Sequence, residues 1–470
     1  MFITALIEHA VCQTWSDEEK GLPHRERGPV SEWEPWRDGC FLLIQCGAMK
    51  IKRIVRMGAP ALMMALMMPL LATAGDAENQ KVLAMRKKAT PAAEFRAALV
   101  AAVTEKGLKE GTSVAYGGEF LYVIEGAPKA KLLVDDKPAV LETTGALRWH
   151  RAVLKTGRSH SMQWFADGVT AGPRVDQPAY LPENYPVAGV PQGTLSEKMT
   201  GESKIYPGMT YDWWTYVPAQ YDGVTPMAVM IWQDGEGHTR RTGPSRTLNV
   251  IDNLTHGKKI PVMISIFINP GTVNGQRWRS IQYDSVNDTF ARYLRDEILA
   301  EVAKKYKIRM DGYSRAIAGN SSGGICAFNA AWWMPDEFSR VLSRVGSFTS
   351  IQWKPGVLDG GNVYPNMVRK MPKRNIRVYM TDGSEDLENS HGSWPLQNIQ
   401  LANSLKMREY DFFFSFGNAQ HNGVQGNADL PASMVWLWRD YDPAKTGQVY
   451  TMDAAEKGKP YYRVAALNRE

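Results

Sequence analysis

The sequence predicts an α/β fold, with a mostly parallel sheet and helices on both faces, preceded by a small all-β domain. From residue 206 onward, short apolar segments that suit buried strands alternate with segments of helical periodicity, as in parallel sheets. Between residues 110 and 170, several short strands are separated by Gly, Pro and Asp turns, which indicates a β-sandwich. A G-x-S-x-G sequence at Gly319–Gly323 stands between a predicted strand and a predicted helix.

The composition and charge of the chain exclude some classes of function. The chain has 470 residues, 22% charged and 44% hydrophobic, which is ordinary for a globular protein and long enough for two domains. The net charge of +6 is modest and no Lys/Arg block is present, so nucleic acid is not an expected partner. Three of the four cysteines precede residue 75, and no Cys/His cluster suits zinc. We expect no metal and no organic cofactor.

The first 74 residues are expected to be missing from the mature protein. A basic segment begins at Met49, an apolar segment covers 59–71, and Ala72-Thr-Ala precedes Gly75. This order is typical of a bacterial secretory signal peptide, and the apolar segment is short for a membrane span. We therefore expect 1–48 to be a wrongly annotated extension and 49–74 to be the signal peptide. The mature protein would be periplasmic or secreted, without stable membrane insertion; a membrane-anchored chain is the alternative.

The remaining elements follow in order. Residues 75–109 are expected to be a helical lead-in, with a helix over 91–103, and 110–170 the β-sandwich. The Pro- and Gly-rich segment 171–205 is expected to be an ordered linker over the surface. The catalytic domain would span 206–445, with a tail at 446–470. Its candidate strands are 213–217, 227–232, 262–268, 315–318, 376–380 and 412–416, and its clearest helix is 288–306, with Asp288 as the expected cap.

Aromatic residues of the β-sandwich have two interpretations. Trp149, His150, Trp164 and Phe165 lie on its predicted strands. Such residues usually form the core of a sandwich, which is the interpretation we prefer. An exposed sugar-binding face is the alternative.

The G-x-S-x-G sequence predicts a nucleophile at Ser321. Glycines on both sides permit a strained turn and close packing, and the following helix directs backbone N–H groups towards the reacting oxygen. A serine hydroxyl needs a base, usually a histidine oriented by a carboxylate. Only His391 and His421 lie downstream, and only His421 follows a final predicted strand, so we assign His421 as the base.

The acid has three candidates after strand 376–380, namely Asp382, Glu385 and Asp386. Asp382 directly follows the strand and suits a turn cap, whereas Asp386 is far enough along the loop to reach beneath the imidazole. We prefer Asp386. For the oxyanion, two backbone N–H donors are needed, and we expect them from Ser322 and Glu236.

Several motifs occur together between residues 200 and 445. They are Ile231–Gly235, Gln282–Asp284, Gly319–Gly324, Asp382–Asp386, Trp394–Asn398, His421 and Trp436–Asp440. Together they resemble the esterase D-like branch of the α/β-hydrolases, which includes enterochelin, feruloyl and acetylxylan esterases, S-formylglutathione hydrolases and mycolyltransferases. The resemblance implies an α/β-hydrolase fold with Ser321, Asp386 and His421 as triad and Ser322 and Glu236 as oxyanion donors.

The resemblance extends to the N-terminal region. Gly189–Gly193 and Trp213–Pro218 are similar to the junction in secreted enterochelin esterase-like proteins, where an immunoglobulin-like (E-set) domain precedes the hydrolase. One departure is the small Ser322 after the nucleophile, where many relatives carry a bulkier residue. The backbone donor does not depend on that side chain.

The expected function is therefore that of an exported serine esterase. Its substrate would be a carbohydrate ester (feruloyl or acetyl) or a siderophore-type ester, with Asp234, Arg277, Arg279 and Trp394 on the substrate side or in surface and packing roles. An acyltransferase and an inactive carbohydrate-binding relative are the alternatives. Residues 110–170 are expected to supply no catalytic atom, and the β-domain to act mainly as a support.

Overall fold

The computed structural model describes residues 75–85, 90–166 and 169–463. The chain divides into two units, Met1–Leu66 and Met67–Glu470, and every described residue belongs to the second. The expected extension and signal peptide, residues 1–74, lie outside the described residues. Across the described ranges, no helix is both long enough and apolar enough to cross a membrane.

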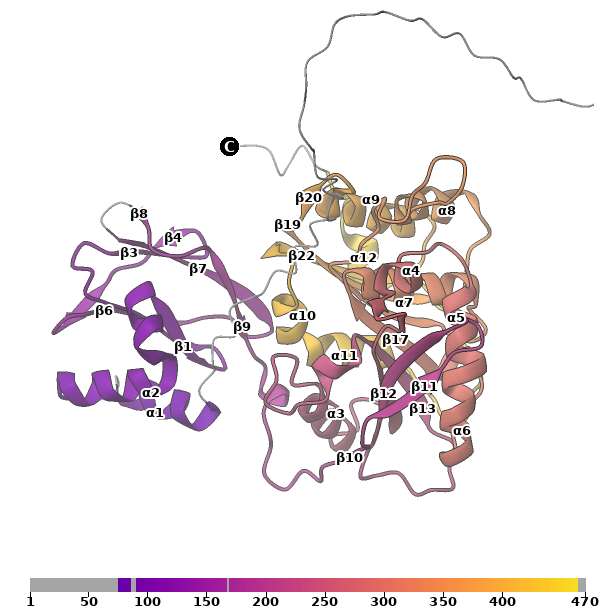
Figure 1. Cartoon of the computed structure of the whole chain (residues 1–470), viewed down its shortest axis with the longest axis horizontal. Coiled ribbons are helices and arrows are strands. Elements are labelled where there is room, and N and C mark those ends of the chain that lie inside the picture. The colour runs from indigo at the N-terminus through magenta and orange to yellow at the C-terminus, as the bar shows by residue number, and fades with distance from the viewer. Residues whose placement is uncertain (1–74, 86–89, 167–168, 464–470) are drawn as a thin grey trace, which may run out of the picture. The chain divides into compact units, whose positions relative to one another are not determined.

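The α/β region contains the predicted mostly parallel sheet (Figure 1). Its strands are β10 (Thr194–Leu195), β11 (Met199–Glu202), β12 (Met209–Val217), β13 (Ala228–Gln233), β14 (Met263–Ile268), β15 (Thr272–Val273), β16 (Gln276–Arg277), β17 (Arg315–Asn320), β18 (Arg340–Arg344), β19 (Arg377–Glu385) and β22 (Asp411–Gln420). The order is β16-β15-β12-β14-β13-β17-β18-β19-β22, with β10 and β11 also pairing with β12. Neighbours from β14 to β22 are parallel, whereas β12 runs antiparallel to β14. The carboxyl ends of the parallel strands therefore meet at one edge, where loops can assemble a site.

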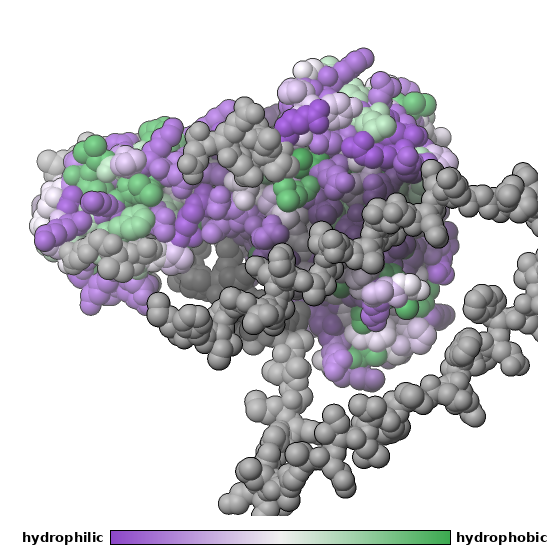
Figure 2. Space-filling model, turned by 90° about the horizontal axis from the view of Figure 1, so that it is seen from above, coloured by the Kyte–Doolittle hydropathy of each residue, from purple (hydrophilic) through white to green (hydrophobic). Residues whose placement is uncertain are grey.

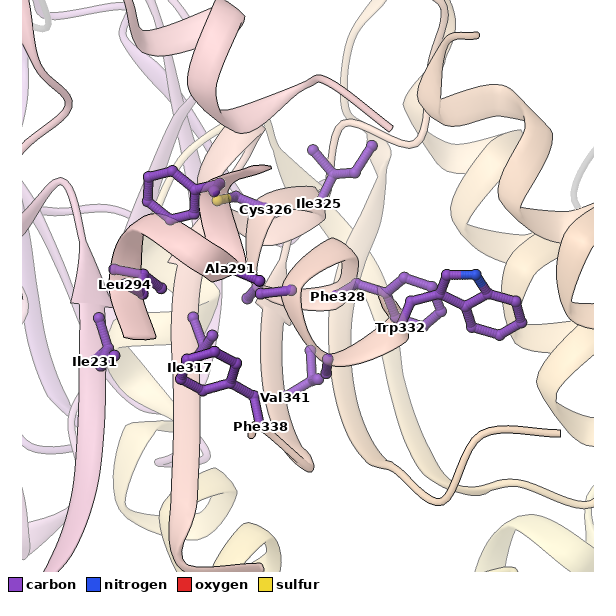
Figure 3. Close-up of a cluster of buried hydrophobic side chains, with 14 of the residues drawn as sticks. Ile231, Ala291, Leu294, Ile317, Ile325, Cys326, Phe328, Trp332, Phe338 and Val341 are labelled. Atoms are coloured by element: carbon purple, nitrogen blue, oxygen red, sulfur yellow. The ribbon is translucent and has the colours of Figure 1, made fainter. Parts of the chain in front are cut away.

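Helices cover both faces of this sheet, as predicted. One layer includes α5 (Thr289–Tyr293), α7 (Ser322–Trp333) and α9 (Trp394–Met407), and the other includes α3 (Thr247–His256) and α11 (Leu430–Trp438). Alternate residues of β13 face opposite layers, because Val229 and Ile231 pack in the first cluster and Met230 and Trp232 in the second. Figure 3 shows the first cluster, in which α7 packs on the central strands. The remaining helices of this region are α4 (Arg279–Tyr283), α6 (Ala300–Lys305), α8 (Tyr364–Lys370), α10 (Val424–Ala428) and α12 (Ala454–Gly458).

The helix predicted over 288–306 is present and starts at the expected position, but its middle differs. Helices α5 and α6 are joined by a π-helical segment, Leu294–Leu299. The predicted apolar face is buried, with Phe290, Leu294, Ile298 and Val302 all in the core. Asp288 makes no capping hydrogen bond; its carboxylate instead pairs with Arg292 one turn later.

The N-terminal region contains two antiparallel sheets. One comprises β1 (Thr112–Tyr116), β2 (Glu119–Glu125), β5 (Glu142–Thr144) and β6 (Leu147–Val153); the other comprises β3 (Lys131–Val134), β4 (Lys137–Pro138), β7 (Arg158–Ala166), β8 (Val169–Thr170) and β9 (Val175–Ala179). Phe120 and Ile124 of the first sheet share a core cluster with Leu132 and Trp164 of the second. Two sheets therefore pack face to face, as expected, while the immunoglobulin-like class stays a prediction. Trp149 and Trp164 are buried, which fits the core interpretation of these aromatics.

The two segments that flank the predicted β-sandwich both contribute to folded structure. The lead-in forms α1 (Asp76–Met85) and α2 (Ala92–Glu110), whose Phe95 and Leu99 pack on the four-stranded sheet and complete its core. The expected linker 171–205 supplies β9 to the five-stranded sheet and β10 and β11 to the large one. Its Pro and Gly residues suggested a linker, but the short extended stretches between them pair with neighbouring strands.

Apolar residues are scattered over the surface. Figure 2 shows one face, on which hydrophilic residues surround smaller apolar areas. Exposed apolar residues such as Val140, Val224 and Val449 come from distant parts of the sequence. Single exposed residues of this kind are normal in globular proteins.

Candidate active site

The G-x-S-x-G sequence forms the predicted sharp turn between β17 and α7. Ser321 has φ 58° and ψ −122°, a sparsely populated conformation that costs a non-glycine residue about 1–3 kcal/mol. A Cβ atom at Gly319 would lie 2.3 Å from the carbonyl oxygen of Gly323, so this position must be glycine. The Ser321 N–H donates to the Arg344 carbonyl oxygen at 2.9 Å, which fixes the turn to β18. Ser321 thus stands at the carboxyl end of the parallel strands.

His421 and Asp386 lie in hydrogen-bond contact with this serine. His421 Nε2 is 2.8 Å from Ser321 Oγ, and His421 Nδ1 is 2.5 Å from Asp386 Oδ1. His421 directly follows β22, and Asp386 directly follows β19, its parallel neighbour. The structure therefore brings together the three residues that the sequence suggested for nucleophile, base and acid.

The other two acid candidates face elsewhere. Asp382 Oδ1 accepts the Gly383 N–H at 2.9 Å, and the Glu385 side chain is exposed. Burial, and next the nearby Asp386 carboxylate, raise the pKa of Asp382 well above its usual range. A raised pKa favours the protonated form of Asp382.

A second serine contacts the Ser321 hydroxyl. Ser347 Oγ lies 3.1 Å from Ser321 Oγ, and Trp394 Nε1–H donates to Ser347 Oγ at 3.1 Å. If the His421 Nδ1–H donates to Asp386, then His421 Nε2 accepts from the Ser321 hydroxyl. Ser321 Oγ must then accept from the Ser347 hydroxyl. One directed chain of hydrogen bonds runs from Trp394 to Asp386.

The two expected oxyanion donors differ in their surroundings. Ser322 is the first residue of α7, where helical N–H groups have no partner within the helix. Glu236 lies in the turn after β13, and its N–H donates to Asn269 Oδ1 at 3.1 Å. A bound oxyanion would have to replace this amide oxygen, so Asn269 is a resident acceptor at the second position.

Comparison with known proteins gives one family match and several similar solved structures. Residues 207–424 match the family profile described as Putative esterase. This part of the chain is similar to that esterase family, and it contains Ser321, Asp386 and His421. No curated protein matches it. Among solved structures, the enterobactin esterase of Shigella flexneri is similar at 14% identity over 71% of this chain and 97% of that chain, with a TM-score of 0.48. A ferulic acid esterase of Anaeromyces mucronatus is similar at 16% identity over 55% of this chain and 95% of that chain, with a TM-score of 0.42.

The match supports an ester hydrolase with an α/β-hydrolase fold. The predicted substrate-side residues of the chain have distinct surroundings. Arg279 donates Nε and Nη2 to Asp234 at 2.9 and 2.7 Å, and Nη2 also to the Asn320 carbonyl oxygen at 3.2 Å. These contacts brace the Asp234 turn of the esterase against the residue before Ser321. Arg277 contacts Asp234 at 3.2 Å and remains 54% exposed.

Trp394, the last of these predicted residues, is a buried wall of the esterase site. Only 2% of it is exposed, and its ring meets the His421 ring edge-on with centroids 5.5 Å apart. The position fits a packing role beside the imidazole, in addition to the hydrogen bond to Ser347.

Sequence reasoning missed Ser347, Asn269 and Asp284 of the esterase. Asn269 directly follows the buried strand β14, and a polar residue at that position is a signal that could have found it. Asp284 is the last residue of the Gln282–Asp284 motif, and burial raises the pKa of its carboxyl to about 7. In the described part of the chain, no three His, Cys, Asp or Glu side chains gather as a metal site requires.

Proposed function

We propose that the protein is an exported serine carboxylic-ester hydrolase that works through an acyl-enzyme. The observation that carries the proposal is the series of hydrogen bonds from Asp386 through His421 to Ser321 at a strained strand-to-helix turn. A nucleophile, a base within reach of its proton and a carboxylate orienting the base are the groups that acyl transfer to serine requires.

In the proposed first step, Ser321 Oγ attacks the ester carbonyl carbon while His421 Nε2 takes the hydroxyl proton. Asp386 stabilises the imidazolium, and the Ser322 N–H binds the oxyanion. The Glu236 N–H joins it by exchanging Asn269 for the substrate oxygen. His421 then protonates the leaving alcohol, which leaves an ester on Ser321.

The second step repeats this chemistry with water. His421 takes a proton from the water, and a second tetrahedral intermediate forms. As this intermediate collapses, His421 returns the proton to Ser321 Oγ and the acid is released. The Ser347 hydroxyl donates to that oxygen in the free enzyme, so it is placed to stabilise the charge that the oxygen acquires as it departs. This assigns Ser347 to deacylation.

The proposed substrate is a carbohydrate ester, such as a feruloyl or acetyl ester, or a siderophore-type ester. The expected export and the accessory β-region support this class, and so does an exposed cation, Arg277, beside the Ser321 turn. A panel of methyl ferulate, acetylated xylan and a catecholate siderophore, with p-nitrophenyl acetate as reference, tests the class. Product analysis with added sugar acceptors separates hydrolysis from acyl transfer.

Alanine variants test the assignment of the residues. Ser321→Ala and His421→Ala should each lower kcat about 10³-fold or more, because triad members act as a unit. Ser350→Ala and His391→Ala are matched controls, since the Ser350 hydroxyl donates to the His391 carbonyl oxygen, Ser350 is half-buried and His391 is exposed. Turnover of p-nitrophenyl acetate that persists at the wild-type level in Ser321→Ala would reject the proposal.

A further inference from the structure

The loop that carries His421 is held by a residue of the N-terminal β-region. Asp176, on strand β9, accepts two hydrogen bonds through a single oxygen, Oδ2. The Gln420 N–H donates to it at 2.7 Å, and Asn422 Nδ2 donates to it at 2.9 Å. Gln420 and Asn422 are the residues immediately before and after His421. One carboxylate oxygen therefore fixes the chain on both sides of the proposed base.

Asp176 is itself fixed. Its side chain is 1% exposed, and Arg174 Nη1 lies 3.1 Å from its other oxygen, Oδ1. Arg174 Nη2 also donates to the Asn418 carbonyl oxygen at 3.1 Å, in β22 and just before the loop of His421. On the adjacent strand β7, the Ser159 N–H donates to Gln425 Oε1 at 2.9 Å. The β-region thus contacts the loop both before and after His421 through polar groups.

The pairing of the large sheet becomes irregular close to the loop that carries His421. Strands β19 and β22 pair in register up to Gly383, and the pairing then shifts between Gly383 and Glu385, just before Gln420. Such an irregularity interrupts the ladder and leaves backbone groups in need of other partners. At this point the Gln420 N–H donates to Asp176.

We infer that Asp176 is a positioning residue for His421, so that strand β9 helps to set the geometry of the active site. The inference rests on the proposed role of His421. His421 must hold Ser321 at 2.8 Å and Asp386 at 2.5 Å together, and both contacts depend on where its backbone lies. Asp176 touches no reacting atom and acts through the backbone of Gln420 and the side chain of Asn422.

A pair of substitutions in the full chain isolates the acceptor. Asp176→Leu removes it at similar volume, and Asp176→Asn keeps an amide oxygen that can accept both bonds. Because a misplacement of about 1 Å can cost roughly 10²-fold in rate, Asp176→Leu should lower kcat for p-nitrophenyl acetate by about 10- to 100-fold. The KM should change by less than about threefold, since the loss falls on the transition state. Asp176→Asn should retain kcat within about fivefold of wild type, its acceptor being intact.

Asp135→Ala is the matched control. Asp135 also accepts one backbone and one side-chain hydrogen bond, from Ser161 N–H at 2.9 Å and His160 Nδ1 at 2.7 Å, but within the β-region itself. It should lower the melting temperature without lowering kcat. Equal loss of kcat in Asp135→Ala and Asp176→Leu would show that general destabilisation is the cause and would overturn the inference.

Proton NMR supplies a readout that general destabilisation would not move. The proton between His421 Nδ1 and Asp386 should give a far-downfield resonance in the wild type and in Asp176→Asn. In Asp176→Leu that resonance should broaden or disappear in a chain that still melts cooperatively. An unchanged resonance together with an unchanged kcat would refute the inference.

Asn422→Asp tests the same contact from the catalytic side if Asp176→Leu does not fold. It sets a second carboxylate against Asp176, so kcat should fall, and adding Asp176→Asn should restore part of it. Wild-type kcat in Asn422→Asp would refute the inference. Ser321→Ala, measured in parallel, distinguishes a failure of this inference from a failure of the proposed function. If Ser321→Ala is inactive while the Asp176 and Asn422 variants are fully active, only the role of Asp176 is rejected. An active Ser321→Ala rejects the proposed function itself.

Discussion

Replacing Asp386 with asparagine should slow the enzyme far more than the same change at Asp382. The Asp386 carboxylate accepts from His421 Nδ1 and from the Leu387 N–H, both at 2.5 Å. An asparagine can turn its amide nitrogen towards His421, which moves the ring proton to Nε2 and leaves no base facing Ser321. The expected loss in kcat is about 10²- to 10⁴-fold, or roughly 3–5 kcal/mol of transition-state stabilisation at about 1.36 kcal/mol per factor of ten.

Asp382→Asn should be nearly silent by comparison. Burial and the adjacent Asp386 raise the pKa of Asp382, which favours its neutral form, so a neutral amide there changes little charge. The amide oxygen can still accept the Gly383 N–H. We expect kcat within about threefold of wild type. Steady-state kinetics on p-nitrophenyl acetate, with melting temperatures to verify folding, compare the two variants. A large loss of kcat in Asp382→Asn, together with a nearly normal kcat in Asp386→Asn, would refute the assignment of Asp386 as the acid.

Three further predictions concern other parts of the chain. Ser347→Ala should slow deacylation and enlarge the initial burst of p-nitrophenol relative to the steady state; an unchanged burst would exclude this role. Burial raises the pKa of Asp284 from its ordinary value of 3.8 to about 7 in the folded protein. As pH rises from about 4 to 7, the unfolded chain releases this proton and the folded protein still holds it, so the free energy of unfolding should fall by up to roughly 4 kcal/mol. Asp284→Asn should therefore flatten the dependence of melting temperature on pH, and an identical slope would contradict the assigned burial effect. Mass spectrometry of the protein from its native host should find an N-terminus near Gly75, and peptides from residues 1–48 would sink the signal-peptide prediction.

The Ser321 turn could be predicted because its constraints are local. The conformation of Ser321 and the close approach of Gly319 to Gly323 demand small residues at fixed spacing, and this spacing is visible in the sequence. His421 was found by elimination, since only one other histidine follows Ser321. Asp386 needed an argument about loop reach, and the irregular pairing after Gly383 is what places it beneath the ring.

Strand β18 was not predicted because its sequence contains charged residues and does not look like that of a buried strand. Both Arg340 and Arg344 are buried, although charged residues normally indicate an exposed segment. The Arg340 guanidinium lies 4.9 Å from the ring centres of both Tyr313 and Trp438, partners that are distant in sequence. Without this strand the position of Ser347, three residues beyond it, could not be inferred.

Asp176 was missed for a similar reason. It lies in a segment whose Pro and Gly content suggested a surface linker, and its partners are about 245 residues away. The expectation that the β-domain acts mainly as a support changes accordingly. A chain lacking residues before 200 would lose Asp176, so turnover of small and bulky esters should fall alike.

The most direct test of the proposed mechanism is mass spectrometry of the enzyme quenched in acid during turnover of p-nitrophenyl acetate. The account predicts one acetyl group per chain, located by peptide mapping on Ser321. Ser321→Ala should carry none, and His421→Ala should acquire it far more slowly. The mechanism would be contradicted if a different residue were acetylated fast enough to account for turnover. It would also be contradicted if Ser347→Ala turned over the ester but no quenched sample of it contained a covalent intermediate.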